Sequence, residues 1–280
     1  MKELAEFRVD EDFVSKLFAD NEGKCLGSVR KIELTTDDPR FKRIGELQRE
    51  IIAKTDRLFF YGWNIRRQYS KAELAEASCF DLRSFSVFEP AGEECGTEYD
   101  ASSGCPHCGA GAKQVGSLIL NVKHIPKGRD IAQTIAGEIV VSRRLVELFK
   151  RQGITGVAMD PLRMSVASSA ESKDWFQLNV QSTDAEIVAP TRVGIDPFDD
   201  DIEGECRCPQ GDLIGLNLLS EVTIRAVTRG EADFVSSRQF IGVRRGLLRP
   251  ERVIFVSPRV KALMESEKVK GCKFEVTQLV

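Results

Sequence analysis

Apolar residues recur at different spacings in the first part of the chain. In the stretch 41–53 they fall three or four residues apart, which predicts an amphipathic helix. The aromatic stretch 58–63 predicts a strand or a buried turn, and the alternation of apolar and polar residues in 81–88 predicts a strand. We therefore expect residues 1–90 to form an N-terminal region that mixes helix and strand.

A second pattern occurs twice in the rest of the chain. An apolar, strand-like stretch ends at Ser142 and again at Ser257, and each serine is well placed as the N-cap of an amphipathic helix. In both copies an arginine lies two residues after the serine, and a glycine ends the helix at the same spacing. We interpret this as a degenerate tandem duplication of residues 95–162 and 206–279. The alternative is that a strand, an N-cap serine, a helix and a terminating glycine often follow one another in proteins, so that the two copies match by coincidence.

These patterns predict an α+β fold with mixed sheets and short helices. We expect two degenerate, related halves joined by a zinc-ribbon-like site. The expected organisation is an N-terminal α/β region (1–90), a first zinc-knuckle copy (91–165), an acidic linker (166–205) and a second copy (206–280).

Composition and charge narrow the class of protein. The chain has 280 residues, of which 42% are hydrophobic, and a net charge of −3, so it can bury a substantial core. This charge gives no electrostatic argument for a nucleic-acid or membrane partner, although a local basic face is compatible with it. No apolar run approaches the ~20 residues that cross a bilayer. The charged start of the chain also lacks the apolar core of a secretory signal, so we expect a soluble, cytoplasmic protein.

Three of the cysteines carry the clearest chemical signal. Cys105 and Cys108 form a Cys-Pro-His-Cys-Gly knuckle, which places two thiolates on one tight turn, and Cys95 lies shortly before it. Zinc favours such soft ligands at tetrahedral angles, and structural sites normally close with four of them. We therefore expect one structural Zn²⁺. The cysteines that read as ordinary buried residues are Cys25, Cys79 and Cys272.

The sequence alone does not decide which residue is the fourth zinc ligand. A standard ribbon would carry a cysteine at position 92, but that residue is Gly92. Cys208 is favoured instead, because Cys-Pro-Gln-Gly resembles the knuckle with its last ligand lost, and Cys206 is nearly as good a substitute. His107 is a further candidate, although its position inside the knuckle makes ligation awkward. The alternative is a group of reduced, buried thiols without metal.

Catalytic signatures are missing from the sequence. Two histidines in the whole chain leave little room for triads or acid–base schemes. There is no glycine-rich phosphate loop, and His124 is not followed by the glutamate that zinc deaminases require. A cysteine-only zinc set is typically closed and structural. The sequence therefore favours a non-enzymatic protein.

An acidic segment between the copies is a candidate partner-binding surface. Its members are Asp199, Asp200, Asp201 and Glu203. The segment lacks the regular ligand spacing of a calcium loop, and the plain alternative is a solvated loop.

An arginine-rich segment supports a different hypothesis, a nucleic-acid-binding zinc-ribbon protein. Its candidate residues are Arg244, Arg245 and Arg249. Arginines close to aromatic residues can hold a single strand. The alternative is that these arginines form ion pairs with nearby acids, which a net charge of −3 makes easy.

The two cysteine turns, each followed by a related strand–helix step, resemble bacterial double-CxxCG motif proteins. The step that runs from Ile139 through Ser142 and Arg144 to Gly156 also looks like one found in immunity proteins of polymorphic toxin systems. The likeness covers roughly residues 90–280. The chain departs from the double motif where Gly92, Gln210 and Gly211 stand in place of cysteines, which puts a second complete metal site in doubt. The resemblance implies a non-enzymatic protein that binds and neutralises a partner such as a cognate toxin, with the acidic segment as a candidate contact.

Overall fold

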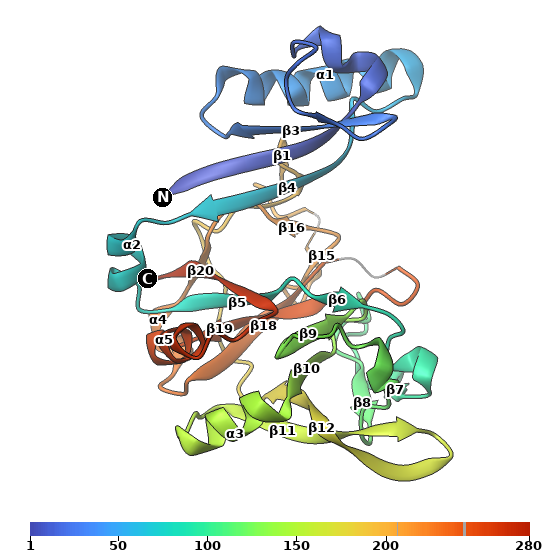
Figure 1. Ribbon diagram of the computed structural model, residues 1–280. Coiled ribbons are helices and arrows are strands. Elements are labelled where there is room, and N and C mark those ends of the chain that lie inside the picture. The colour runs from blue at the N-terminus through green and yellow to red at the C-terminus, as the bar shows by residue number, and fades with distance from the viewer. Residues whose placement is uncertain (206, 243–244) are drawn as a thin grey trace. The chain divides into compact units, whose positions relative to one another are not determined.

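The computed structural model of the chain describes residues 1–205, 207–242 and 245–280 (Figure 1). Contacts divide the chain into two compact units. Unit 1 comprises Met1–Glu76 and Pro197–Asp199, and unit 2 comprises Ala77–Asp196 and Asp200–Val280. Buried apolar clusters lie within each unit.

Unit 1 combines an antiparallel sheet with one long helix. The strand order is β2-β3-β1-β4, and helix α1 (Pro39–Thr55) connects β3 to β4. The strands are β1 (Lys2–Asp10), β2 (Lys24–Cys25), β3 (Val29–Thr35) and β4 (Phe60–Gln68). A 3₁₀ helix (Glu11–Lys16) follows β1, and α2 (Lys71–Glu76) follows β4.

Local sequence sets both ends of α1, which confirms the helix predicted in 41–53. Asp38 is the N-cap, and its side chain accepts a hydrogen bond from the N–H of Arg40 (2.8 Å). Pro39 follows in the first turn, where its missing N–H costs nothing. The helix ends where Asp56 adopts a left-handed conformation. The periodic apolar residues face the buried core: Ile44, Leu47 and Ile51.

A phenylalanine from far along the chain completes this core. The ring of Phe198 packs against Phe7 and Phe41, with ring centroids 5.8 and 4.9 Å apart. Gly45 of α1 makes the approach possible, because a Cβ at that position would lie 2.5 Å from Phe198. The short segment Pro197–Asp199 therefore belongs to unit 1.

Unit 2 contains two larger sheets, with the orders β11-β12-β10-β9-β6 and β15-β18-β19-β5-β20-β17. The strands of the first are β6 (Val87–Phe88), β9 (Ile131–Thr134), β10 (Ile139–Ser142), β11 (Val157–Ser165) and β12 (Ser168–Val180). The strands of the second are β5 (Phe80–Ser84), β15 (Leu213–Ile214), β17 (Val222–Ile224), β18 (Phe234–Gly242), β19 (Glu251–Val256) and β20 (Cys272–Leu279).

Shorter elements fill the connections. Two small sheets have the orders β7-β8 and β14-β13-β16. Their strands are β7 (Glu98–Asp100), β8 (Lys113–Val115), β13 (Val193–Asp196), β14 (Asp199–Asp200) and β16 (Asn217–Leu218). The helices are α3 (Arg143–Arg151), α4 (Ala226–Arg229) and α5 (Pro258–Ser266), with 3₁₀ helices at Glu93–Cys95, Ala101–Ser103 and Val122–His124.

The two larger sheets repeat one arrangement. In β6-β9-β10-β12-β11 and in β15-β18-β19-β5-β20, the first pair is parallel and the next three pairs are antiparallel. The register repeats as well. Val157 pairs with Val180 in one sheet, and Cys272 pairs with Ser84 at the corresponding place in the other. This repeated topology supports the hypothesis of a tandem duplication.

Each half of unit 2 contributes one strand to the sheet of the other half. We call residues 77–165 the first half of unit 2, and residues 166–280 that belong to unit 2 the second half. Strand β5 of the first half lies between β19 and β20 of the second half (Figure 1). Strand β12 of the second half lies between β10 and β11 of the first half. Because an inner strand is hydrogen-bonded on both sides, neither sheet is continuous without the other half.

The same side-chain network begins the helix of each half. Ser142 is the N-cap of α3, and its hydroxyl donates to Asp130 (3.2 Å), which also forms an ion pair with Arg144 (2.8 Å). Burial alone would raise the pKa of Asp130, but the hydrogen bonds and charge of Arg144 hold it below its ordinary value. The corresponding residues of the second half are Ser257, Asp233 and Arg259, with distances of 2.7 and 3.2 Å.

The prediction of an α+β fold with mixed sheets and short helices is confirmed, with strands predominating. The compact units divide the chain differently from the expected regions. Residues 77–90, expected in the N-terminal region, supply β5 and β6 to unit 2. Residues 168–180, expected in the acidic linker, form β12, whose polar first part conceals the strand pattern in the sequence.

Candidate metal centre

The knuckle of the first half is a tight turn that connects β7 to β8. The N–H of Cys105 donates a hydrogen bond to the carbonyl oxygen of Ala110, and the N–H of Gly109 donates one to the carbonyl oxygen of Cys105, both at 2.7 Å. Gly109 has a φ of 68°, a conformation that glycine adopts without strain. The N–H groups of Cys108 and His107 donate to the Cys105 thiol and hold its pKa below the ordinary value. The turn therefore favours a thiolate at Cys105.

A comparable turn lies at Cys208 in the second half. The N–H of Cys208 donates a hydrogen bond to the carbonyl oxygen of Asp212 (2.9 Å), and the N–H of Gly211 donates one to the carbonyl oxygen of Cys208 (2.7 Å). The N–H of Gln210 points at the Cys208 sulfur, 3.4 Å away. The second turn thus presents its thiol with the same kind of backbone support as the knuckle.

The two turns bring four ligand atoms together. The sulfurs of Cys105 and Cys208 are 3.6 Å apart, and the Cys108 sulfur is 3.4 Å from Oδ2 of Asp212. All four ligand atoms lie within 4.8 Å of one another. Two sulfurs bound at about 2.3 Å to one tetrahedral zinc would be about 3.8 Å apart, whereas a disulfide needs about 2.05 Å. The spacing suits ligands of a shared ion.

Asp212 is oriented by the sheet of the second half. Its Oδ1 accepts a hydrogen bond from the N–H of Phe240 in β18 (2.9 Å), and only 6% of the residue is exposed. This leaves Oδ2 turned towards the Cys108 sulfur. Metal-binding carboxylates are commonly held by such a second hydrogen bond, which fixes the oxygen that faces the ion.

Electrostatics also favour a cation at this place. Burial raises the pKa of the Cys108 thiol to about 12, and the hydrogen bond that this thiol donates to Asp212, together with its contacts to the neighbouring thiols, contributes. A thiol in these surroundings ionises only when positive charge compensates it. Coordination to a divalent metal provides that charge and removes the proton.

The structure places the other expected ligands differently. Cys95 ends a 3₁₀ helix and packs against the buried cluster around Phe88, and it is not among the four grouped residues. Cys206 lies outside the described residues. His107 is exposed on the knuckle and also stands apart from the group. Cys105, Cys108 and Cys208 are brought together as the sequence suggested.

Asp212 is the ligand candidate that the sequence reasoning missed. Gly211 stands where a second cysteine of the Cys208 turn is expected, and the aspartate follows it directly. The closing hydrogen bond of this turn joins Cys208 to Asp212, whereas that of the knuckle joins Cys105 to Ala110, so the second turn is one residue shorter. The sequence signal for this ligand is an acidic residue, Asp212, directly after Gly211, the position at which the cysteine is missing.

The acidic segment is only partly free to meet a partner. Asp200 forms an ion pair with Arg192 (2.7 Å), and Asp201 forms one with Arg207 (3.1 Å). Asp199 and Glu203 are exposed. Surface charge on this segment therefore rests mainly on those two residues.

The arginine segment is described in part. Arg244 lies outside the described residues, and Arg245 is exposed. Arg249 forms an ion pair with Glu93 (2.6 Å), and its guanidinium lies over the Tyr99 ring, 3.8 Å from the centroid. The charge of Arg249 is thus balanced within the protein, as the alternative reading of this segment anticipated.

Comparisons with known proteins provide no assignment for this site. No protein-family model matches the chain, and no curated protein matches it significantly. Among the helices of the described chain, none combines the length and apolar character needed to span a bilayer.

Proposed function

We propose that Cys105, Cys108, Cys208 and Asp212 hold one structural zinc ion that fastens the two halves of unit 2 together. The observation that supports this most is the origin of the ligands. Two come from the knuckle of the first half, and two come from the corresponding turn of the second half. Bound zinc would therefore cross-link segments about a hundred residues apart in sequence.

Zinc is the metal that suits this donor set best. Three thiolates favour a soft or borderline cation, and four ligands at tetrahedral spacing suit an ion without a geometric preference of its own. With all four positions taken by protein, the site leaves no open position for substrate or water. Its role is accordingly structural, and it does not supply the activated water of a catalytic zinc site.

The metal assignment is tested by analysing the full-length protein as purified from metal-supplemented cells. We expect one zinc per chain by inductively coupled plasma mass spectrometry. Cys108→Ser should lose most of it and melt at lower temperature, because zinc binding adds to the free energy of folding. Cys25→Ser, at an exposed position in unit 1, is the matched control and should keep both. Full zinc content and an unchanged melting temperature in Cys108→Ser would show that the assignment is wrong.

We further infer that this scaffold is a non-enzymatic, protein-binding module of the cytoplasm, of the kind of an immunity protein that neutralises a toxin. The support is the resemblance of the cysteine turns and strand–helix steps, together with the exposed acids Asp199 and Glu203. A reducing compartment is consistent with thiolate ligation, since oxidised cysteines do not bind zinc.

Partner capture from the source cell tests this part separately. The chain is retrieved at native levels, with and without nuclease, and bound proteins are identified by mass spectrometry. One stoichiometric protein that survives nuclease and is lost with Asp199→Asn/Glu203→Gln would support the inference. Recovery that disappears with nuclease would instead favour the nucleic-acid hypothesis and Arg245.

A further inference from the structure

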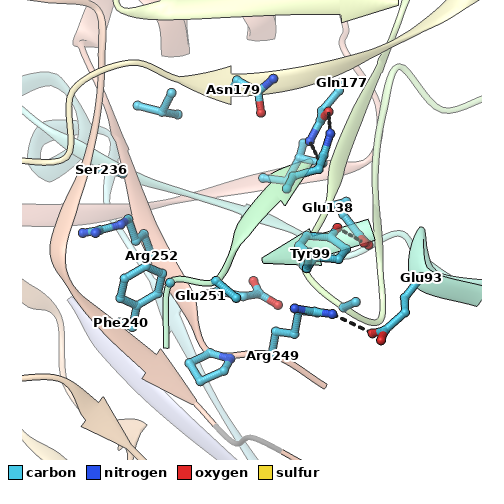
Figure 2. Close-up of a pocket in the computed structure, with 18 of the residues that line it drawn as sticks. Glu93, Tyr99, Glu138, Gln177, Asn179, Ser236, Phe240, Arg249, Glu251 and Arg252 are labelled. Carbon is cyan, nitrogen blue, oxygen red and sulfur yellow. Dashed lines mark hydrogen bonds and ion pairs between the residues drawn. The ribbon is translucent and has the colours of Figure 1, made fainter. Parts of the chain in front are cut away.

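A cavity of about 750 Å³ lies in unit 2, beside the knuckle. Gly109 and Gly111 of the knuckle form part of its wall, and segments from both halves contribute the rest. Figure 2 shows its charged and aromatic side chains. Those used below are Glu93, Tyr99, Glu138, Arg249, Glu251 and Arg252.

Glu251, at the start of β19, directs its carboxylate into this cavity between two aromatic–arginine pairs (Figure 2). One carboxylate oxygen accepts a hydrogen bond from the amide of Gln133. Gly137 gives the side chain room, since a Cβ there would lie 2.7 Å from Cγ of Glu251. Among the residues that the structure describes, no lysine or arginine forms an ion pair with Glu251. Burial raises its pKa to about 7, and the nearby charge of Glu138 adds to the effect.

The two arginines of the cavity are engaged elsewhere. Arg249 is paired with Glu93 and stacked on Tyr99. Arg252 lies over the ring of Phe240, 4.0 Å from its centroid, and donates to backbone carbonyl oxygens at the bend of β18. Neither cation neutralises Glu251, so the cavity offers an anionic group more readily than a cationic one.

Glu138 is a second carboxylate with neutral partners. It accepts hydrogen bonds from the hydroxyls of Tyr99 (2.6 Å) and Thr134, and from the N–H of Gly92 (3.3 Å). Within the described chain it has no ion pair. The cavity therefore holds two buried or half-buried carboxylates that are solvated by neutral donors only, an arrangement in which a cation is strongly attracted.

We propose that this cavity binds a positively charged group, a guanidinium or ammonium, through an ion pair with the carboxylate of Glu251. The volume exceeds a single such group and suits a ligand of ordinary small-molecule size or a side chain with its flanking backbone. Tyr99 and Phe240 already hold arginines of this chain over their ring faces, which leaves the carboxylate of Glu251 as the group that meets the ligand's cation. The proposal does not depend on metal binding at the neighbouring turns.

Binding should be linked to pH. A cation stabilises the ionised carboxylate, so the ligand binds the deprotonated form of Glu251 and affinity rises as pH passes through about 7. The charge that acts on Glu251 is that of Glu138, from the segment before β10. The other charged and titratable groups that line the cavity are Glu93, Tyr99, Arg249 and Arg252.

The test uses the full-length protein as purified and a pair of acetylated, amidated tripeptides. One carries a central arginine, and the other carries citrulline, which has the same shape without the charge. Calorimetry at pH 8 should detect the arginine peptide and not the citrulline peptide. Glu251→Gln should weaken binding at least tenfold, while Glu147→Gln, on the exposed face of α3, should leave it unchanged.

Free agmatine distinguishes the source of the charged group. Agmatine that binds as tightly as the peptide would assign the cavity to a small amine, and a clear preference for the peptide would assign it to a protein side chain. Both results support a cation site. Equal binding to Glu251→Gln, or no binding of either cation at millimolar concentration, would overturn the proposal. Carbon-13 NMR of the Glu251 carboxyl provides a second measurement without mutation, because its pKa should fall when the arginine peptide is added.

Discussion

Arg144, in the first turn of α3, donates a hydrogen bond to the carbonyl oxygen of Glu267, the residue that caps the end of α5 (3.1 Å). The contact is reciprocal, because Arg259 in the first turn of α5 donates to the carbonyl oxygen of Gln152 at the end of α3. The last carbonyl groups of a helix lack partners within the helix and carry partial negative charge. Each helix thus receives at its C-terminus the cation that stands at the N-terminus of the other.

The aspartates behind these arginines should be important for stability. Asp130→Asn and Asp233→Asn should each lower the free energy of unfolding by about 1–3 kcal/mol, because each loses a charged, largely buried acceptor that holds a serine and an arginine. Asp174→Asn is the control, since that side chain is 82% exposed beside Arg143. Urea denaturation measures the differences. A loss in the control as large as in the other two would contradict this account.

Two glycines near the end of α3 should differ sharply in their tolerance of alanine. Both have positive φ, but a Cβ at Gly156 would lie 2.2 Å from the carbonyl oxygen of Phe234, whereas nothing lies within 4 Å of one at Gly153. Gly156→Ala should therefore cost several kcal/mol, and Gly153→Ala only the strain of its conformation, about 1 kcal/mol. Thermal unfolding provides the comparison. Gly271→Ala should behave like Gly156→Ala, because its Cβ would meet the carbonyl oxygen of Ile131.

The carboxylate ligand can be tested without removing its shape. Asp212→Asn should keep the hydrogen bond from Phe240 but lose the negative charge, so zinc affinity should fall by at least tenfold. Asp184→Asn, at an exposed position, should leave the affinity unchanged. Competition with a chromophoric chelator measures both. Equal affinity in the two variants would remove Asp212 from the ligand set.

Glu251 should make stability depend on pH. Its pKa is about 7 in the folded protein against an ordinary value of 4.5, so the folded state holds more protons than the unfolded state between these limits. Stability therefore falls as pH rises from about 4.5 to about 7, by up to about 3 kcal/mol, and then levels off. Glu251→Gln should remove this slope and gain most over the wild type at pH 8. Chemical denaturation at pH 5 and pH 8 tests the sign, with Glu147→Gln as the control.

The core of unit 1 should depend on Phe198. Phe198→Ala removes a ring packed on Phe7 and Phe41 and leaves the surface of Gly45 uncovered, so it should cost unit 1 about 2–3 kcal/mol. Each unit contains one tryptophan, and a Trp175→Phe background leaves Trp63 to report on unit 1 by fluorescence. Phe85→Ala, at an exposed position of unit 2, should not move that transition.

Local signals in the sequence were sufficient where a residue acts on its near neighbours. Ser142 and Ser257 cap the helices that begin directly after them, and the backbone hydrogen bonds of the knuckle join Cys105 to Gly109 and Ala110, only a few residues away. The role of Asp212 was hidden because it depends on a one-residue change in a turn and on a hydrogen bond from Phe240.

Long-range relationships escaped the sequence for a different reason. The alternation in β5 predicts a strand but does not say which sheet receives it, and its neighbours β19 and β20 lie near the other end of the chain. The place of Phe198 was equally invisible, because a short Asp-Pro-Phe-Asp stretch reads as a polar loop until its ring is seen on α1. Local propensity indicates which secondary structure a segment can form, and tertiary packing determines where that segment lies in the fold.

The exchange of β5 and β12 has a consequence for the order in which the chain can fold during its synthesis. β5 leaves the ribosome long before the strands on both of its sides, β19 and β20, have been made. At about 5–20 residues per second, roughly 10 to 40 seconds pass between the synthesis of β5 and that of both its neighbours. Throughout that interval a strand with two unpaired edges and the apolar side chains of Phe80 and Leu82 is exposed to other nascent chains, so we expect chaperones to bind this stretch.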